Sequence, residues 1–382
     1  PIRYLNAGST PDYSLRSGDS ISVATGNLRF SRGSGGGGEQ SWRLMPTEAI
    51  IFDNDNPRTG APEVSGSLRV ASFNVLNFFS HIDTGAANCG YASRHNCRGA
   101  DSKKELRRQL AKIASALALI DADIIGLIEL ENDTGASIAK LVDALNRHIG
   151  GGNYEYIDTG TINDDAIKTG FIYDALSVRA LTKFALLDSS VDYRFKENKN
   201  RPALAQTFEE LSNGAVLTVV VNHLKSKGSS CDSTGDRNVR DGQGNCNLAR
   251  RNAAESIADW IKTDPTDSGD PDYLIIGDLN AYPEEDPLAA LQNAGLTNLL
   301  AGQADVYSFA FDGQVGALDY ALATRSLLVQ VIDTIAWHIN ADEPPLLDYN
   351  LEHGRNPDLF NAASPYRASD HDPIIIGLDL TK

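Results

Sequence analysis

Residues 366–376 read Tyr-Arg-Ala-Ser-Asp-His-Asp-Pro-Ile-Ile-Ile, a polar cluster followed directly by a short β-branched run. The apolar run predicts a buried strand, which would hold Asp370 and His371 rigidly at its start. A carboxylate can bind a hard cation, and an imidazole can transfer a proton near neutral pH. A single Asp-His pair is more often an ordinary loop pair, so the interpretation depends on whether other strands bring partners to the same place.

Other apolar runs end in the same kind of polar tip. Residues 68–74 end at Asn74, residues 124–129 end at Glu129, residues 219–223 end at His223, residues 275–280 contain Asp278 and Asn280, and Asp319 lies beside a further short apolar segment. Residues i and i+2 of an extended tip face the same side, so Asp278 and Asn280 would point at one phosphate. If all these ends converge, they form a metal-binding pocket that also contains proton-transfer groups.

The order of these tips resembles the endonuclease/exonuclease/phosphatase superfamily over residues 63–380. Within that superfamily, the chain is similar to the branch of secreted bacterial extracellular nucleases. The segments shared with that branch are residues 98–100, 107–109, 200–204 and 337–344. The resemblance implies the α+β DNase I-like fold, a four-layer α/β/β/α sandwich.

The resemblance also implies a role for each tip residue. Glu129 and Asp370 are expected to hold Mg²⁺, for which Mn²⁺ can substitute. His371, oriented by Asp319, is expected to activate water, and His223 to protonate or stabilise the leaving oxygen. The remaining members, expected to hold the phosphate in line, are Asn74, Asp278 and Asn280. Two points stay open: family members differ in whether the residue at Asp278 is the base, and a structural Ca²⁺ is neither indicated nor excluded.

Composition sets limits on what this chain can be. It has 382 residues and a formal net charge of −17, with 34 Lys and Arg against 51 Asp and Glu. This length allows one large domain with an additional piece, and we expect a monomer. Such acidity is not typical of a simple phosphate-binding protein. No apolar run is long enough to cross a bilayer, and the expected signal peptide of an exported protein is absent from the sequence.

Positive charge is nevertheless concentrated locally. The stretch from Arg94 to Lys112 has seven Lys or Arg against two acids. The candidates for phosphate contact are Arg107, Arg108, Arg201, Lys225, Arg250 and Arg251. The alternative for the first stretch is a solvated helix face. Arg201 can clamp a phosphate but cannot orient an imidazole by accepting its proton, so the partner of His223 stays open.

The four cysteines form two local pairs, Cys89 with Cys97 and Cys231 with Cys246. Neither pair has further Cys or His residues at zinc-finger spacing. We therefore expect two disulfides, as in an exported protein, rather than a zinc site.

Residues 1–62 differ from the rest and predict a β-rich extension, similar to the end of an OB-like unit but too short for a barrel. The extension contains an alternating stretch at residues 20–30, a glycine-rich loop at residues 34–38 and a linker near residues 59–62. Residues 63–382 are the predicted catalytic domain. Inside it, helices are expected at residues 102–120 and 247–261, and residues 168–173 and 203–208 are expected to be neighbouring strands.

Together these features predict a secreted, metal-dependent nuclease that hydrolyses the phosphodiester bonds of DNA, with RNA left open. Because nothing reads base edges, we expect little sequence specificity, and we expect internal cuts. One alternative is a phosphodiesterase or phosphatase of the same fold that acts on lipids or small phosphate esters. Another is a nonhydrolytic nucleic-acid-binding or matrix protein, which would need neither metal ligands nor proton-transfer groups.

Overall fold

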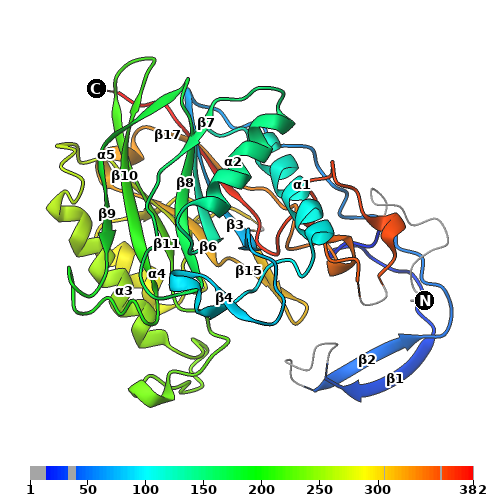
Figure 1. The fold of residues 1–382 in the computed structure, drawn as a ribbon. Coiled ribbons are helices and arrows are strands. Elements are labelled where there is room, and N and C mark those ends of the chain that lie inside the picture. The colour runs from blue at the N-terminus through cyan, green and yellow to red at the C-terminus, as the bar shows by residue number, and fades with distance from the viewer. Residues whose placement is uncertain (1–13, 33–39, 305, 353–354, 382) are drawn as a thin grey trace.

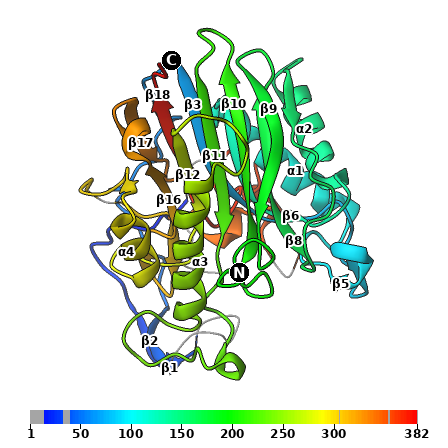
Figure 2. The same cartoon turned by 90° about the vertical axis from the view of Figure 1, so that its left-hand side faces the viewer.

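Two β-sheets stacked face to face form the centre of the molecule (Figure 1). The computed structural model describes residues 14–32, 40–304, 306–352 and 355–381. Each of the two sheets has six strands, and helices cover their outer faces (Figures 1 and 2). The layers therefore run helix, sheet, sheet, helix, and the predicted α/β/β/α sandwich is confirmed.

Each sheet mixes parallel and antiparallel neighbours. Sheet I consists, in spatial order, of β17 (Val331–Ala336), β18 (Ile374–Leu378), β3 (Leu68–Phe78), β6 (Ile124–Glu131), β8 (Ile167–Asp174) and β7 (Tyr154–Tyr156). Sheet II consists of β13 (Thr297–Asn298), β16 (Asp319–Ala323), β12 (Tyr273–Asp278), β11 (Val216–His223), β10 (Arg201–Glu210) and β9 (Val178–Leu187). The parallel pairs are β3 with β6 and β11 with β12. Because β18 and β16 run antiparallel to β3 and β12, they begin where those strands end.

The central strands are apolar on both faces because both faces are buried. In β12, Leu274 and Ile276 pack between the two sheets, whereas Ile275 packs against the outer helices. The sheets approach closely at Gly126, where an added Cβ would lie 2.6 Å from the Cδ1 atom of Ile276. This double burial explains the continuous apolar runs that precede the polar tips.

Helices α1 (Lys103–Ile120) and α2 (Ala136–His148) cover sheet I. As predicted, α1 begins after Ser102, whose hydroxyl accepts a hydrogen bond from the Glu105 amide at 3.2 Å. Only half of the expected capping box forms, because the Glu105 carboxylate accepts from the Asp101 amide instead. The outer layer over sheet I is therefore fixed by a local sequence signal and by apolar packing.

Helices α3 (Asn247–Trp260) and α4 (Asp286–Asn293) cover sheet II (Figure 2). Ala253, Ile257 and Trp260 of α3 are buried, as predicted. The short helix α5 (Arg325–Leu328) connects β16 to β17. Among the described residues, no helix combines the length and apolarity that a membrane span requires.

The predicted pairing of residues 168–173 with residues 203–208 is wrong. The first stretch lies in β8 and the second in β10, so they belong to opposite sheets. They meet face to face, with the rings of Phe171 and Phe208 5.7 Å apart. Two strands that are apolar on both faces give no sequence signal that separates edge pairing from face packing.

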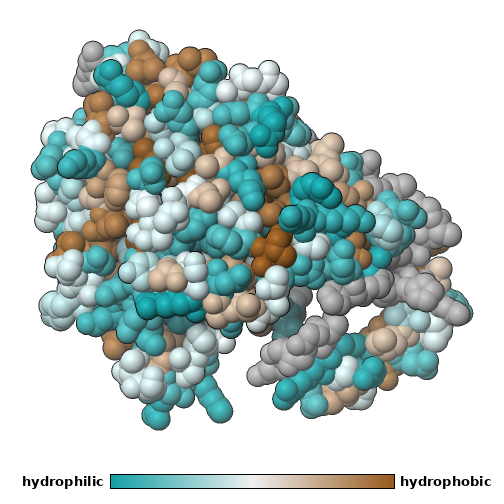
Figure 3. Space-filling view, viewed as in Figure 1, coloured by the Kyte–Doolittle hydropathy of each residue, from teal (hydrophilic) through white to brown (hydrophobic). Residues whose placement is uncertain are grey.

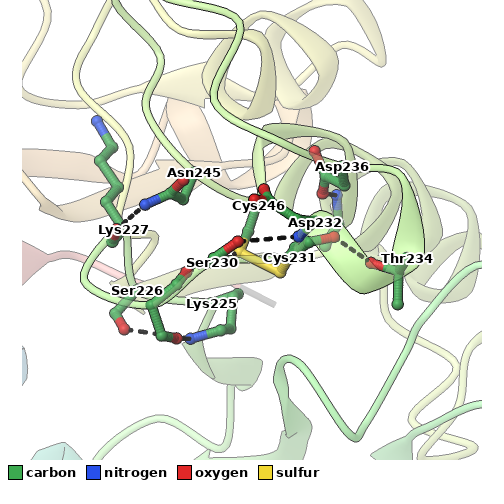
Figure 4. The surroundings of a disulfide bond; sticks show 12 residues. Lys225, Ser226, Lys227, Ser230, Cys231, Asp232, Thr234, Asp236, Asn245 and Cys246 are labelled. Carbon is green, nitrogen blue, oxygen red and sulfur yellow. Dashed lines mark hydrogen bonds between the residues drawn. A yellow bond between two sulfur atoms is a disulfide. The ribbon is translucent and has the colours of Figure 1, made fainter.

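Short elements fill the connections. The two-stranded ladders are β4 (Ala87–Cys89) with β5 (His95–Asn96) and β14 (Phe309–Phe311) with β15 (Gln314–Gly316), and the 3-10 turns are Tyr91–Ser93, Asp232–Thr234, Ile261–Thr263, Pro345–Leu347 and Pro357–Leu359. Both predicted disulfides are present: one joins Cys89 to Cys97, and the other, shown in Figure 4, joins Cys231 to Cys246. The Cα atoms of the two pairs are 5.1 and 5.3 Å apart, within the normal disulfide range.

The N-terminal extension contains one β-ladder within the described residues. It is the antiparallel hairpin of β1 (Gly26–Ser31) and β2 (Ser41–Pro46), which stands out from the body of the molecule (Figures 1 and 3). The glycine-rich loop predicted at residues 34–38 lies outside the described residues. The proposed division of the chain near residue 62 stays a prediction.

Candidate active site

One row of side chains crosses sheet II at the edge where β11 and β12 end. The strand register pairs Arg201 with His223, His223 with Asp278, and Asp278 with Asp319. Neighbouring strands lie about 5 Å apart, so the sheet itself brings these four tips together. All of them except Arg201 are buried.

Sheet I faces this row with polar tips of its own. The Oε1 atom of Glu129, in β6, lies 4.0 Å from the Nε2 atom of His223. The loop that contains Asp370 and His371 leads into β18 at the same end of the molecule. The structure therefore brings the strand tips of the two sheets together at one end of the molecule, which we call the cleft below, as the sequence prediction required.

Asp319 and His371 form a buried pair. The Nδ1 atom of His371 lies 2.7 Å from the Oδ2 atom of Asp319, and the ring of Phe309 packs 4.6 Å from the imidazole. Burial alone would lower the pKa of His371, but the Asp319 carboxylate outweighs burial and raises that pKa well above its usual value. His371 is therefore the charged histidine of the site.

The hydroxyl of Ser308 fixes this pair from behind. It donates to the Oδ2 atom of Asp319 at 2.6 Å and accepts from the backbone amides of Leu318 and Asp319 at 3.0 Å each. Sequence reasoning did not find Ser308, because a serine in a loop of mixed composition carries no local signal.

Asp278 is held by the residue two positions later. The backbone amide of Asn280 donates to Oδ1 at 2.8 Å, and its side-chain amide donates to Oδ2 at 3.0 Å. The tip bends at Gly277, with a φ of +127°, where a Cβ would lie 2.1 Å from the carbonyl oxygen of Asn222. Burial, followed by repulsion from Asp319, raises the pKa of Asp278 to about 8. Asp278 and Asn280, which the sequence predicted to face one phosphate, thus hydrogen-bond to each other.

His223 has a different environment. Its Nε2 atom lies 3.6 Å from Asp278 Oδ2 and 3.4 Å from a guanidinium nitrogen of Arg201, while its buried Nδ1 atom has no hydrogen-bond partner. Burial, followed by the positive charge of Arg201, lowers the pKa of His223 well below its usual value. Because its pKa is so low, the imidazole of His223 is neutral. Among the described residues, no carboxylate binds its Nδ1 atom.

Glu129 is positioned by Asn77, a second residue that sequence reasoning missed. The backbone and side-chain amides of Asn77 both donate to Glu129 Oε2, at 2.9 and 2.7 Å. Both residues have positive φ values, 48° for Asn77 and 67° for Glu129. Such strained backbone persists where the surroundings fix it, commonly at functional sites. This arrangement leaves Oε1 of Glu129 facing the cleft.

Asn74 and Asp370 complete the acidic side of the cleft. Asn74 accepts a hydrogen bond from the Leu76 amide at 3.0 Å through Oδ1, and its amide lies beside Glu129. Burial and then the negative charge of Asp370 raise the pKa of Glu129. Asn74 therefore bonds its own turn, and its amide also faces the site.

Residues 337–344, for which the sequence suggested no role, brace the loop that carries His371. Asp372 accepts hydrogen bonds from the amides of Ile339, Asn340 and Ala341 at 2.7 to 3.0 Å. The side chain of Asn340 donates to the His371 carbonyl at 2.6 Å and accepts from the Ser369 amide at 3.1 Å. This segment thus fixes both ends of the Asp370-His371 dipeptide.

The same segment anchors the N-terminal extension through buried ion pairs. Arg16 lies 3.1 Å from Asp342 and 3.4 Å from Glu343, and Arg58 lies 2.6 Å from Glu343. Asn56 also donates to Asp342, at 2.9 Å. The extension is therefore anchored to the segment that braces the catalytic loop, and Thr59 also accepts a hydrogen bond from Tyr366 of the loop itself.

The six predicted phosphate-binding residues fall into three pairs. Arg201 and Lys225 lie at the cleft, and Arg107 and Arg251 are exposed on helices. Arg108 and Arg250 are buried instead. Arg108 binds the Tyr349 carbonyl and Glu352, and Arg250 binds the carbonyls of Gln243, Lys225 and Asn245. Because their guanidinium groups are committed to the protein, we exclude these two residues from the substrate surface.

The donor set of the cleft fits a hard divalent cation. Donor atoms of Asp278, Asp319 and His371 lie within 4.8 Å of one another, but His371 is charged and bonded to Asp319, so carboxylates rather than the imidazole would hold the cation. Glu129 lies close enough to Asp370 for their charges to interact, and the buried Asp319 Oδ1 atom has no partner. Carboxylates crowd the site, and oxygen ligands of this kind suit Mg²⁺ or Mn²⁺. A second group, His81, Cys89 and Glu131, does not fit, because Cys89 is in a disulfide.

Comparison with known proteins decides the family. The sequence model of the Endonuclease/Exonuclease/phosphatase family matches residues 71–371, which is most of the chain. The chain belongs to the endonuclease/exonuclease/phosphatase family. Members of this family hydrolyse phosphate esters and are generally dependent on divalent metals. No curated protein sequence matches the chain.

Solved structures of this family share its fold. An endonuclease/exonuclease/phosphatase from Bacteroides vulgatus is 15% identical, with a TM-score of 0.50 and coverage of 82% of this chain and 99% of its own. A family protein from Bacteroides thetaiotaomicron is 14% identical, with a TM-score of 0.52 and coverage of 81% and 96%. A mannosyl-6-phosphatase from the same organism has a TM-score of 0.47 at 14% identity and coverage of 81% and 99%. At such low identity, the first two structures, with TM-scores of 0.50 and 0.52, establish the fold alone.

Proposed function

We propose that this endonuclease/exonuclease/phosphatase is a secreted nuclease that hydrolyses the phosphodiester bonds of DNA with little sequence specificity. The observation that carries the proposal is the row Arg201, His223, Asp278 and Asp319, set against Glu129 of the opposite sheet. It combines metal-binding, proton-transfer and phosphate-binding groups in one cleft. A protein that only bound nucleic acid would need neither of the first two.

The environments of the two histidines assign their roles. His371 is charged through its pair with Asp319, so it suits the stabilisation of negative phosphate oxygens rather than the removal of a proton. Asp278 has a pKa raised to about 8, so its ionised form, which accepts a proton, becomes the major form as the pH rises through that value. We therefore assign the role of general base, which accepts the proton of the attacking water, to Asp278 rather than to His371. The sequence had left this choice open.

The remaining cleft residues hold the substrate. His223, which is neutral, lies where it can hydrogen-bond the leaving oxygen through Nε2 as the bond between phosphorus and that oxygen breaks. Asn74 and Asn280 hold the phosphate in line. Glu129 and Asp370 would hold the metal, which when bound neutralises charge that develops on the phosphate oxygens.

A polymeric substrate explains the positive charges on one side of the cleft. Arg201 and Lys225 lie together there, with Lys199 and Arg98 close enough for their charges to act on Lys225 and His223. Arg201 and Arg98 share one carboxylate, that of Asp165, at 3.0 and 3.7 Å, so the positive side chains here outnumber the acid that pairs with them. Several adjacent phosphates match this charge better than one small ester does.

The test is digestion of closed circular DNA with Mg²⁺, Mn²⁺ or a chelator. We expect nicked or linear products and acid-soluble nucleotides with metal, no products with chelator, and loss of nearly all activity in His371→Ala. Single-stranded RNA in parallel reports the second substrate. Intact DNA, together with hydrolysis of a phosphorylated lipid or small phosphate ester, would reassign the protein to the phosphatase branch of the family.

We propose that the protein is exported, which the two disulfides support because such bonds persist in oxidising compartments. We propose an extracellular monomer. Sedimentation of the purified protein and thiol titration before and after reduction test both statements. Free thiols in protein recovered from the medium would contradict export in the oxidised form.

A further inference from the structure

The first disulfide closes a short loop, residues 87–98, beside the end of sheet I that carries the strand tips. Cys89 and Cys97 are buried in one small apolar cluster with Phe79 and Ile167. Ile167 is the first residue of β8, and it lies opposite the end of β6 in the sheet (Figure 1). The disulfide therefore anchors this loop next to the cleft.

Basic side chains of the loop bind two neighbouring acids. The Nε atom of Arg94 and the Nε2 atom of His95 lie 3.1 and 2.7 Å from Oδ1 of Asp164. The Nη2 atom of Arg98, which directly follows the disulfide, lies 3.7 Å from Oδ1 of Asp165. Asp164 thus has two close basic partners, whereas Asp165 holds Arg98 only loosely.

Asp165 also contacts the row of strand tips on sheet II. Its Oδ2 atom accepts a hydrogen bond from Nε of Arg201 at 3.0 Å, and Nη1 of the same guanidinium lies 3.4 Å from Nε2 of His223. The Ala166 amide donates to Oδ1 at 2.6 Å, which fixes the carboxylate. The two oxygens of Asp165 therefore face one arginine each, and two guanidinium groups that share one carboxylate can bind a further anion.

Arg98 has the capacity to bind such an anion. Its side chain is 45% exposed, and the contact with Asp165 is its only ion pair within the part of the chain that the structure describes. Its charge acts in the cleft, because burial and then positive neighbours that include Arg98 lower the pKa of His223. A planar guanidinium can bind a phosphate through two of its N–H groups.

We propose that Arg98 binds the phosphate next to the scissile one, and that Asp165 is a positioning residue that spaces Arg98 and Arg201 for two successive phosphates of one strand. The inference rests on the proposed nuclease function and deepens it. Arg201 contacts His223, which faces the leaving oxygen, so Arg201 serves the scissile phosphate. Arg98, at the other oxygen of Asp165, serves the neighbouring phosphate. The substrate class is therefore a chain of linked phosphodiesters rather than a single small ester.

Binding without hydrolysis tests the role of Arg98. The Kd for a short labelled DNA duplex is measured by fluorescence anisotropy, without metal, in His371→Ala and in His371→Ala/Arg98→Ala at several salt concentrations. Loss of one phosphate contact should weaken binding about tenfold, and the fall of log affinity with log salt concentration should become shallower by about 0.9. A side chain that only held its loop in place would change the affinity without changing this slope.

Two further substitutions of arginine in the same His371→Ala background control for charge and for folding. Arg98→Lys keeps the charge, so it should keep the salt slope of the parent protein. Arg179→Ala removes another exposed arginine that pairs with one carboxylate, that of Glu209, but at the far end of β10 from Arg201. Both the affinity and the salt slope should stay the same in Arg179→Ala.

Asp165→Asn tests the positioning role through the direction of its effect. Removing a negative charge beside a phosphate site would by itself strengthen DNA binding. We expect binding to weaken instead, by about threefold or more, because Arg98 and Arg201 lose the carboxylate that orients them.

An unchanged salt slope in the Arg98→Ala protein, or tighter DNA binding in the Asp165→Asn protein, would overturn the proposal. These outcomes leave the nuclease assignment intact if the wild type cuts DNA. A wild type that leaves DNA intact and hydrolyses a small phosphate ester would instead remove the nuclease assignment, and this inference with it.

Discussion

At the scale of single residues, two histidines in one cleft differ because of one neighbour each. His371 contacts the carboxylate of Asp319, and His223 contacts the guanidinium of Arg201. The first contact favours the imidazolium and the second disfavours it. The site therefore holds one charged and one neutral imidazole at the same pH in a single conformation.

Asn77 gives the first prediction at this scale. Replacing Asn77 by Ala removes the side-chain donor that holds Oε2 of Glu129, so Oε1 loses its fixed direction. We expect about a 10- to 100-fold loss of activity and of apparent Mg²⁺ affinity, measured by titrating metal against DNA hydrolysis. Asn213→Ala is the control, because that amide also bonds a carboxylate and a carbonyl but lies outside the cleft. Equal activity in the two variants would contradict a positioning role for Asn77.

Lys225 gives a prediction about pH. Burial, followed by repulsion from Arg201, lowers its pKa to about 8. Since only the protonated amine attracts phosphate, DNA binding should weaken as pH rises above about 8. Arginine stays charged at that pH, so Lys225→Arg should bind DNA with no such decline. The measurement is the Kd for DNA of His371→Ala and of His371→Ala/Lys225→Arg between about pH 7 and about pH 9.5. An equal loss of affinity in both proteins would show that a group other than Lys225 titrates.

At the scale of elements, residues 337–344 connect three parts of the chain. They hold the catalytic loop through Asn340, and they hold the N-terminal extension through Asp342 and Glu343. The carboxylate of Glu343 is fully buried and contacts both Arg16 and Arg58. A change at this carboxylate should therefore be felt both in stability and at His371.

Glu343→Gln tests that connection. The substitution leaves two guanidinium groups, which are mostly buried, facing a neutral amide, and we expect a loss of about 3 kcal/mol in the free energy of unfolding. The rate of DNA hydrolysis should fall as well. The control is Glu352→Gln, whose carboxylate is 40% exposed and should cost about 1 kcal/mol or less. Urea unfolding of both variants measures the two losses. An equal loss of unfolding free energy in both would contradict a special contribution from the buried Glu343 ion pairs.

The same elements show how far sequence reasoning reaches. A polar residue that follows an apolar run, as at Glu129 or Asp278, can be recognised because the strand and its tip are adjacent in sequence. Asn77, Ser308 and Asn340 could not be recognised, because each acts on a partner far away in the chain. Arg250 was misassigned for a related reason: an arginine on a helix has the same sequence pattern whether it faces solvent or a set of buried carbonyls.

At the scale of the whole molecule, charge is separated rather than balanced. A net charge of −17 coexists with positive side chains beside the strand tips, among them Arg201 and Lys225. On the proposed function, these side chains would attract a nucleic-acid strand that the net charge of the chain repels. This separation also places several carboxylates of like charge at the centre of the fold, where burial makes their repulsion costly.

That repulsion gives the last prediction. Glu129 lies among Asp278, Asp319 and Asp370, so a bound divalent cation should stabilise the folded protein by about 2.7 kcal/mol at a concentration 100 times its Kd. We therefore expect the Tm to rise with Mg²⁺ and to fall with chelator. Glu129→Gln removes one buried charge, so its metal-free form should be at least as stable as the metal-free wild type, and Mg²⁺ should no longer raise its Tm. Glu155→Gln, an exposed carboxylate on β7, is the control and should keep the full response. A Glu129→Gln protein that Mg²⁺ stabilises as much as the wild type would place the cation elsewhere.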